Sequence, residues 1–143
     1  MDFASAPTMT HSRVRLEQLT FDHEADLAVA SAADGLCEAW VTNIPSPSGM
    51  RNEIERRLGL QERGVMAPFA IIEPESNTAV GMTTYMNIDV ANRRVEIGST
   101  WIATRVQRTG LNPAAKLLLL TRAFEELDCI AVEFRTHVRN DQS

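Results

Sequence analysis

The sequence predicts an α/β (α+β) domain in which helices flank a mostly antiparallel sheet. Three observations lead to this fold class. Residues 79–89 alternate between apolar and polar side chains, as a strand with one buried face does. Residues 112–127 carry helix start signals and an apolar spacing of three and four residues. Short runs rich in β-branched residues, bounded by turn residues, predict further strands on either side of this helix.

The N-terminal segment is expected to form one strand and one helix after a loose tail. Residues 1–12 are small and polar, which predicts a flexible tail. Alternating apolar residues predict a strand over 13–19. Thr20 or Asp22 suits the N-cap of a helix that runs to about residue 33, where an Asp-Gly pair breaks it.

A second helix is expected after a loop. Residues 36–47 contain two prolines and no helical or strand period, which predicts the loop. Ser46 or Ser48 suits the N-cap of a helix that reaches Arg57 or beyond. The apolar side of this helix is formed by Met50, Ile54 and Leu58.

Three antiparallel strands follow as a β-meander. They are predicted over residues 68–73, 79–89 and 95–102, with turns at 74–77 and 91–93. Two faces of the middle strand are predicted, one with Val80, Met82, Met86 and Ile88, and the other with Thr83, Tyr85, Asn87 and Asp89. Gly98 interrupts the third strand, which indicates a bulge or a close backbone approach.

A basic connection, residues 103–111, joins the third strand to the helix over 112–127, and a last strand follows over 130–136. Asn112 is a good N-cap, and Pro113 suits the first helical position. The predicted buried face consists of Leu117, Leu120, Phe124 and Leu127. A glycine loop before a helix N-terminus favours an anion site, because free N–H groups and the helix dipole both attract negative charge. An ordinary strand-to-helix turn is the alternative.

Composition and charge restrict the classes of function. The 143 residues suffice for one domain with a hydrophobic core. The net charge of −5 argues against a nucleic-acid partner, which would need a basic face. No apolar run approaches the ~20 residues that span a bilayer, and residues 1–12 lack a secretory signal, so a cytoplasmic protein with no membrane partner is expected. Isolated Cys37 and Cys129 and scattered histidines show no metal-ligand spacing, so no metal is expected.

The stretch Gln107-Arg108-Thr109-Gly110-Leu111-Asn112 resembles the Gln/Arg-x-x-Gly-x-Gly/Ala pyrophosphate loop of the GNAT superfamily of acetyl-CoA-dependent N-acetyltransferases, with Asn112 in place of the last glycine or alanine. Trp101 before it and Ala-Lys-Leu-Leu-Leu at 115–119 after it are similar to the RimJ/RimL-like branch. The resemblance implies a GNAT-type domain over residues 13–143, with a mixed sheet. The C-terminal helix and strands of the family are expected to be missing, because they follow the Asn140 position.

The function that the resemblance implies is transfer of an acetyl group from acetyl-CoA to a primary amine by direct attack in a ternary complex. Its acceptor would be a small-molecule or peptide amine. Such a reaction needs a base, since most amines are protonated at neutral pH. The alternative is a truncated or degenerate GNAT protein without catalysis, which serves as a CoA-binding or partner subunit.

The resemblance also assigns roles to residues. Cofactor contacts are expected from Trp101, Ile102, Ala103, Gln107, Arg108, Thr109, Gly110, Leu111, Asn112, Lys116 and Asn140. Catalytic roles are expected for Glu96, as the base, and for Asn140. Acceptor contacts are expected from Trp40, Tyr85 and Asn87. For Glu96 the alternative is a half-exposed strand residue without chemistry, for Trp40, Tyr85 and Asn87 a structural role, and for Lys116 a solvated side chain.

The strand over 130–136 is interior to the sheet in the family, so a chain that ends at Ser143 is expected to leave its edge open. Apolar Ile130, Val132 and Phe134 would then be exposed. This predicts a homodimer, or association through the exposed sheet edge.

Overall fold

A computed structural model of the chain describes residues 3–32, 45–107 and 109–134. The predictions made for Trp40, Arg108 and Asn140 lie outside the described residues.

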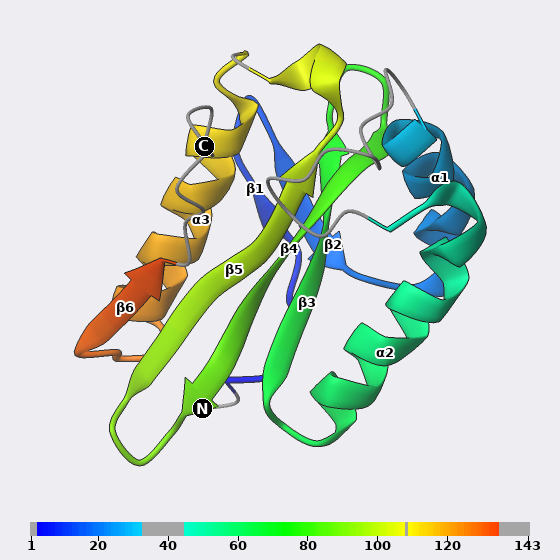
Figure 1. The fold of residues 1–143 in the computed structure, drawn as a ribbon. Coiled ribbons are helices and arrows are strands. Elements are labelled where there is room, and N and C mark those ends of the chain that lie inside the picture. The colour runs from blue at the N-terminus through cyan, green and yellow to red at the C-terminus, as the bar shows by residue number, and fades with distance from the viewer. Residues whose placement is uncertain (1–2, 33–44, 108, 135–143) are drawn as a thin grey trace.

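Six strands form one sheet in chain order (Figure 1). They are β1 (Met9–Thr10), β2 (Arg15–Gln18), β3 (Met66–Glu73), β4 (Thr78–Asp89), β5 (Arg94–Ile102) and β6 (Ala131–Phe134). Neighbouring strands are antiparallel from β1 to β5, and only β5 and β6 are parallel. The prediction of a mixed, mostly antiparallel sheet is confirmed.

Helices lie on opposite sides of this sheet, with α1 and α2 on one side and α3 on the other (Figure 1). The helical elements are η1 (Phe21–His23), α1 (Glu24–Ala32), η3 (Pro47–Gly49), α2 (Met50–Glu62), η4 (Thr104–Val106) and α3 (Leu111–Glu125). None of the helices described is long and apolar enough to cross a membrane. The predicted order of strands and helices is confirmed over the described residues.

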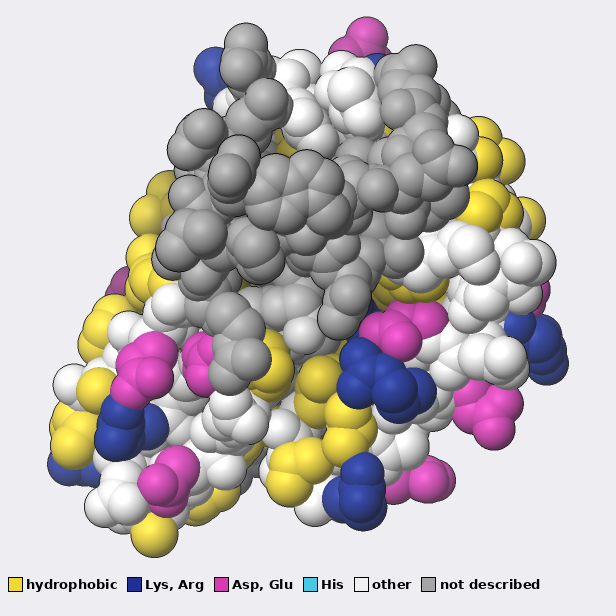
Figure 2. Space-filling model, in the orientation of Figure 1, with side chains coloured by type: hydrophobic (Ala, Val, Ile, Leu, Met, Phe, Trp, Pro, Cys, Tyr) yellow, Lys and Arg dark blue, Asp and Glu magenta, His cyan; other side chains and the backbone are white. Residues whose placement is uncertain are grey.

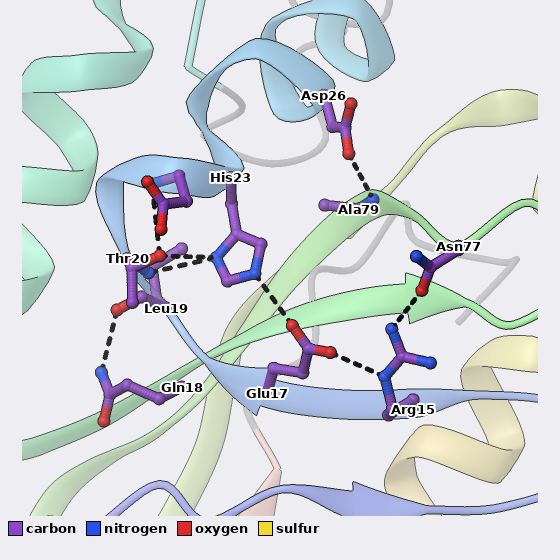
Figure 3. Close-up of polar contacts among 10 residues, drawn as sticks. Arg15, Glu17, Gln18, Leu19, Thr20, His23, Asp26, Asn77 and Ala79 are labelled. Atoms are coloured by element: carbon purple, nitrogen blue, oxygen red, sulfur yellow. Dashed lines mark hydrogen bonds and ion pairs between the residues drawn. The ribbon is translucent and has the colours of Figure 1, made fainter.

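The predicted start signals of the first two helices are confirmed. The Thr20 hydroxyl accepts the Asp22 backbone N–H, and the His23 ring Nδ1 accepts the Thr20 N–H at 3.1 Å, which completes a capping box. The other ring nitrogen of His23 contacts Glu17, whose carboxylate also pairs with Arg15 (Figure 3). This network ties the start of α1 to β2. Ser46 caps η3, directly before α2.

The N-terminal residues are packed instead of forming the predicted flexible tail. Met9 and Thr10 pair with β2 as an edge strand, and Phe3 is only 5% exposed. Phe3 belongs to the hydrophobic core that the rest of the sheet forms. Hydrophobic periodicity does not indicate this packing, because a two-residue strand and one buried aromatic ring are too short to show a period.

The helix after the basic connection does not start at Asn112. Gly110 is the N-cap, with a left-handed φ of 87°, and Leu111 is the first helical residue. The predicted buried face is only partly right. Leu127 is 1% exposed and Leu120 packs partly buried against the core, but Leu117 and Phe124 are 54% and 49% exposed. The helix instead buries Leu111, Asn112, Ala114, Ala115, Leu119, Arg122 and Ala123. Most residues of this buried face are small, whereas the larger apolar Leu117 and Phe124 face the solvent.

The predicted alternation of β4 does not persist along the strand, because Thr83, Thr84 and Tyr85 are all buried. The register between β4 and β5 shifts twice, and Asn87 in β4 and Ser99 in β5 have positive φ angles of 49° and 51°. These are β-bulges, each of which inserts one residue and changes which side chains share a face. The bulge expected at Gly98 therefore lies at its neighbour Ser99.

Candidate functional site

The N-terminus of α3 is open to an anion. Among the described residues no side chain caps it, and its first backbone N–H groups have no partner within the helix. The Asn112 side chain lies in the first turn instead of capping it, and its Oδ1 has no hydrogen-bond partner among the described residues. Gly110 has no side chain to cover the approach. This end of the 15-residue helix α3 thus offers free donors and a positive dipole to a phosphate.

An arginine from the N-terminal part of the chain contacts this loop. Arg13 Nη1 donates to the Thr109 carbonyl at 3.2 Å. The same atom lies 2.9 Å from the place where a Cβ on Gly110 would be. Sequence reasoning missed Arg13, since 96 residues separate it from Thr109 and no local pattern connects them. The loop therefore has a cation beside its glycine.

Two other cations of this region, Arg105 and Lys116, have partners of their own. Arg105 pairs with Glu73 at 2.8 Å. Lys116 Nζ lies 5.9 Å from the centre of the Phe134 ring, and burial lowers the pKa of Lys116. The Gln107 side chain donates to the Ile102 carbonyl at 3.5 Å, and Thr109 Oγ1 donates to the Val106 carbonyl.

The end of β5 leads into this loop. The Ala103 N–H donates to the Val80 carbonyl at 2.7 Å, so this N–H group points toward β4. On its other side β5 pairs with β6 only from Arg94 to Ile97. Beyond Ile97, no strand of the described chain lies along that side of β5, where the sequence predicts backbone contacts to the cofactor. The Trp101 side chain is 3% exposed, and its Nε1 has no partner among the described residues.

Glu96, the predicted base, lies near the start of β5, and 8% of its surface is exposed. Asn87 Nδ2 donates to Glu96 Oε1 at 2.8 Å. The sequence left open whether Glu96 shares a face with Tyr85. Met86 pairs with Glu96 and Tyr85 pairs with Ile97, so Glu96 and Tyr85 point to opposite faces. The structure thus brings together Glu96 and Asn87.

Tyr85 lies in the core on the α3 side. Its ring is fully buried against Phe69 in an edge-to-face contact, and its hydroxyl donates to the Leu119 carbonyl of α3. Burial raises the pKa of Tyr85. Such a side chain has no surface for an acceptor, so we leave Tyr85 out of the candidate site.

A buried ion pair lies on the α2 side of β5. Arg57 Nε donates to Glu53 Oε2 at 2.7 Å, and Arg56 pairs with the same carboxylate. Burial by itself would raise the pKa of Glu53, but hydrogen bonds and charge from Arg56 and Arg57 outweigh it and lower this pKa. Sequence reasoning missed this pair, because no local pattern distinguishes Arg57 from the exposed charged residues of the same helix.

The lowered pKa of Glu53 predicts acid sensitivity. Its folded-state pKa is below the unfolded value, so the ionised carboxylate stabilises the fold above the unfolded pKa, and this stability is lost as the pH falls toward the folded pKa. We expect the melting temperature of Glu53→Gln to depend less on pH below about pH 5 than that of the wild type. Glu55→Gln, on the exposed side of α2, is the control. If the melting temperatures of Glu53→Gln and the wild type changed with pH in the same way, this expectation would be contradicted.

Among the described residues, no group of three or more His, Cys, Asp or Glu side chains is placed to hold a metal ion.

Comparisons with known proteins agree on one family. The model of the acetyltransferase (GNAT) domain matches residues 13–143. A Bacillus subtilis (strain 168) protein named "Putative ribosomal N-acetyltransferase YdaF" is 41% identical over 63 residues, which are 44% of this chain and 34% of that protein.

Two solved structures show the same fold. A GCN5-related N-acetyltransferase from Brucella melitensis has a TM-score of 0.82 and 23% identity, over 95% of this chain and 62% of that one. The microcin C7 self immunity acetyltransferase MccE, in complex with acetyl-CoA and AMP, has a TM-score of 0.73 and 17% identity, over 91% of this chain and 73% of that one. The chain spans 34% of YdaF and 62% of the Brucella protein.

Proposed function

This chain belongs to the GNAT acetyltransferase domain family, and on that basis we propose that it transfers an acetyl group from acetyl-CoA to a primary amine. The observation that carries the proposal is the uncapped N-terminus of α3, with Gly110 at its start and Arg13 beside it. A pyrophosphate needs this combination of free N–H donors, positive charge and close backbone approach.

The residues of the loop fit acetyl-CoA. The backbone from Thr109 to Asn112 and the guanidinium of Arg13 would hold the pyrophosphate, and the free side of β5 beyond Ile97 would hold the pantetheine arm. Acetyl-CoA supplies an acyl carbon joined to a thiolate that leaves readily. MccE, a protein of the same fold, has been solved in complex with acetyl-CoA and AMP.

Glu96 is the proposed base. A lysine side chain titrates near about 10.4 and an α-amino group near about 8, so an acceptor amine arrives mostly protonated at pH 7. Glu96 would take this proton, directly or through water, and the hydrogen bond from Asn87 would fix the orientation of its carboxylate. The amine nitrogen then forms a bond to the acetyl carbon in the ternary complex. The carbon–sulfur bond breaks, the nitrogen loses one proton as it becomes the amide, and the CoA thiolate gains one proton and leaves as the thiol.

The acceptor is proposed to be a peptide amine. YdaF is named a ribosomal N-acetyltransferase, and its similarity to this chain favours an amino group of a protein over an amino sugar or a polyamine. A small-molecule amine is the alternative outcome of the test below.

The test offers acetyl-CoA with one amine class at a time: peptides with a free N-terminus, lysine peptides, polyamines and amino sugars. Release of CoA thiol and an acetylated product in the mass spectrum are expected with a peptide. CoA binding in calorimetry without turnover on any amine would instead support a non-catalytic CoA-binding or partner subunit. Absence of both binding and turnover would overturn the proposal.

We also propose that two copies of the chain associate through β6. Among the described residues β6 is the outermost strand on its side of the sheet, and apolar side chains lie along this edge of the molecule (Figure 2). Ile130 and Phe134 are 64% and 42% exposed. An open apolar edge of this kind favours pairing with a second strand.

Light scattering checks this association. We expect a dimer or a larger species at micromolar concentration, and a shift toward monomer in Ile130→Lys. Val29→Lys, on α1 and equally exposed to solvent, should leave the mass unchanged. A monomeric wild-type chain would contradict the proposal.

A further inference from the structure

We propose that Arg57 is a positioning residue, which sets the shape of β5 between the proposed base and the backbone that receives the cofactor. This inference rests on the proposed function, because it assigns the bulge of β5 a part in acetyl-CoA binding. The observation behind it is that Arg57, a charged residue, is buried, whereas charged side chains are rarely buried.

Arg57 is 1% exposed, although it lies on a helix whose neighbouring charges face the solvent. A guanidinium stays charged when it is buried, so its burial is costly unless partners replace its water. Nε donates to Glu53 at 2.7 Å, and Nη2 donates to the Ser99 carbonyl at 3.1 Å. Arg57 therefore connects α2 to β5, across 42 residues of sequence.

Its contact on β5 is the bulged residue. Met82 pairs with Trp101 and Thr84 pairs with Gly98, so the segment of β5 around Ser99 has one residue more than the facing segment of β4. Ser99 takes a φ of 51°, in the left-handed region that residues with a Cβ rarely adopt. Such a conformation persists only where the surroundings fix it.

Side chains hold the carbonyls on both sides of the bulge. Thr84 Oγ1 donates to the Gly98 carbonyl at 2.9 Å, from within the sheet. The next carbonyl, that of Ser99, accepts from Arg57, which reaches it from the helix layer. This helix layer contains α2, which lies on the side of the sheet opposite to α3 (Figure 1). In Figure 2 basic and acidic side chains lie next to one another over α2.

The bulge lies between the two parts of the candidate site. Glu96 precedes Ser99 on β5, and Trp101 to Ala103 follow it. Each inserted residue changes the direction of the strand and the face to which later side chains point. If the bulge relaxes, the backbone beyond Ser99 changes its course relative to the α3 N-terminus. Arg57 therefore acts on cofactor binding through Ser99 and touches no reacting atom.

The neighbouring Arg56 provides a matched control. Both arginines pair with Glu53, but Arg56 is exposed and, within the described part of the chain, donates hydrogen bonds to Glu53 alone. We expect Arg57→Met to weaken CoA binding about tenfold in calorimetry, and Arg56→Met to leave it unchanged. Arg57→Lys, which keeps the charge but loses the fork that reaches two partners, should resemble Arg57→Met.

A second substitution separates positioning from a general loss of stability. Ser99→Gly removes the Cβ that makes the left-handed conformation costly, so it should restore part of the CoA affinity of Arg57→Met. The amide resonances of Ser99 and Thr100 should also move in Arg57→Met and Arg57→Lys but not in Arg56→Met, with or without CoA.

The outcomes are distinct. A wild-type chain that binds no CoA overturns the proposed function. Arg57 variants whose Ser99 and Thr100 resonances stay in place overturn the positioning role, whether or not CoA binds. Weaker CoA binding that Ser99→Gly does not restore overturns the route through the bulge. Should Arg57→Met fail to fold, Arg57→Lys carries the same comparison.

Discussion

Replacing Glu96 with glutamine is expected to lower the turnover of acetyl transfer about a hundredfold at neutral pH, because an amide cannot accept the proton of the acceptor amine. Glutamine keeps the size of the side chain and an oxygen that can still accept the hydrogen bond from Asn87. The loss should shrink at high pH, where more of the amine arrives neutral. The measurement is the pH dependence of kcat, followed by thiol release.

The control for this substitution is Glu133→Gln. Glu133 lies directly beside Glu96 in the register of β5 and β6, but it is exposed and pairs with Arg94. Glu133→Gln should leave turnover unchanged within about twofold, because an exposed ion pair contributes little. A pH–rate profile of Glu96→Gln that matches the wild type would place the base elsewhere.

Replacing Gly110 with valine is expected to weaken CoA binding about tenfold or more, since the loop loses both its backbone approach and its conformation. Gly110 has a φ of 87°, and a Cβ there would lie 2.9 Å from Arg13 Nη1. The side chain would therefore push the arginine away from the Thr109 carbonyl, where it now donates a hydrogen bond. Calorimetry with CoA measures the effect.

Gly64→Val separates this effect from backbone strain. Gly64 also has a positive φ, 76°, but an added Cβ would meet nothing within 4 Å, and it lies between α2 and β3, away from the loop. Both variants should lower the melting temperature, whereas only Gly110→Val should change CoA affinity. Equal affinity of Gly110→Val and the wild type would remove the loop from the cofactor site.

Local patterns in the sequence were sufficient for the elements of this fold. Thr20 and Ser46 were recognised as helix starts because capping depends on residues three positions apart. The β-meander followed from period-two alternation and turn residues, and its strands are found within one or two residues of the predicted bounds. The loop between β5 and α3 was also recognised, because its glycine and the helix after it are neighbours in the chain.

Patterns failed where a choice between two apolar faces had to be made. In α3 the larger residues, Leu117 and Phe124, suggested the buried side, yet the helix packs through Ala114, Ala115 and Ala123. Periodicity shows which apolar residues share one face of a helix. It does not show which of two such faces packs against the sheet. The start of α3 was misplaced for a related reason, since Asn112 suits a cap but Gly110 supplies the left-handed turn.

The sequence alone thus determined the fold class, the order of the elements and the position of the glycine loop before α3, since each depends on residues close together in the chain. Only the tertiary structure decided the composition of the site. It brings Arg13 to Thr109, turns Asn87 toward Glu96 while Tyr85 enters the core, and buries Arg57 against Ser99. These contacts depend on the register of paired strands and on two bulges, and a shift of one residue reverses the face of every side chain that follows.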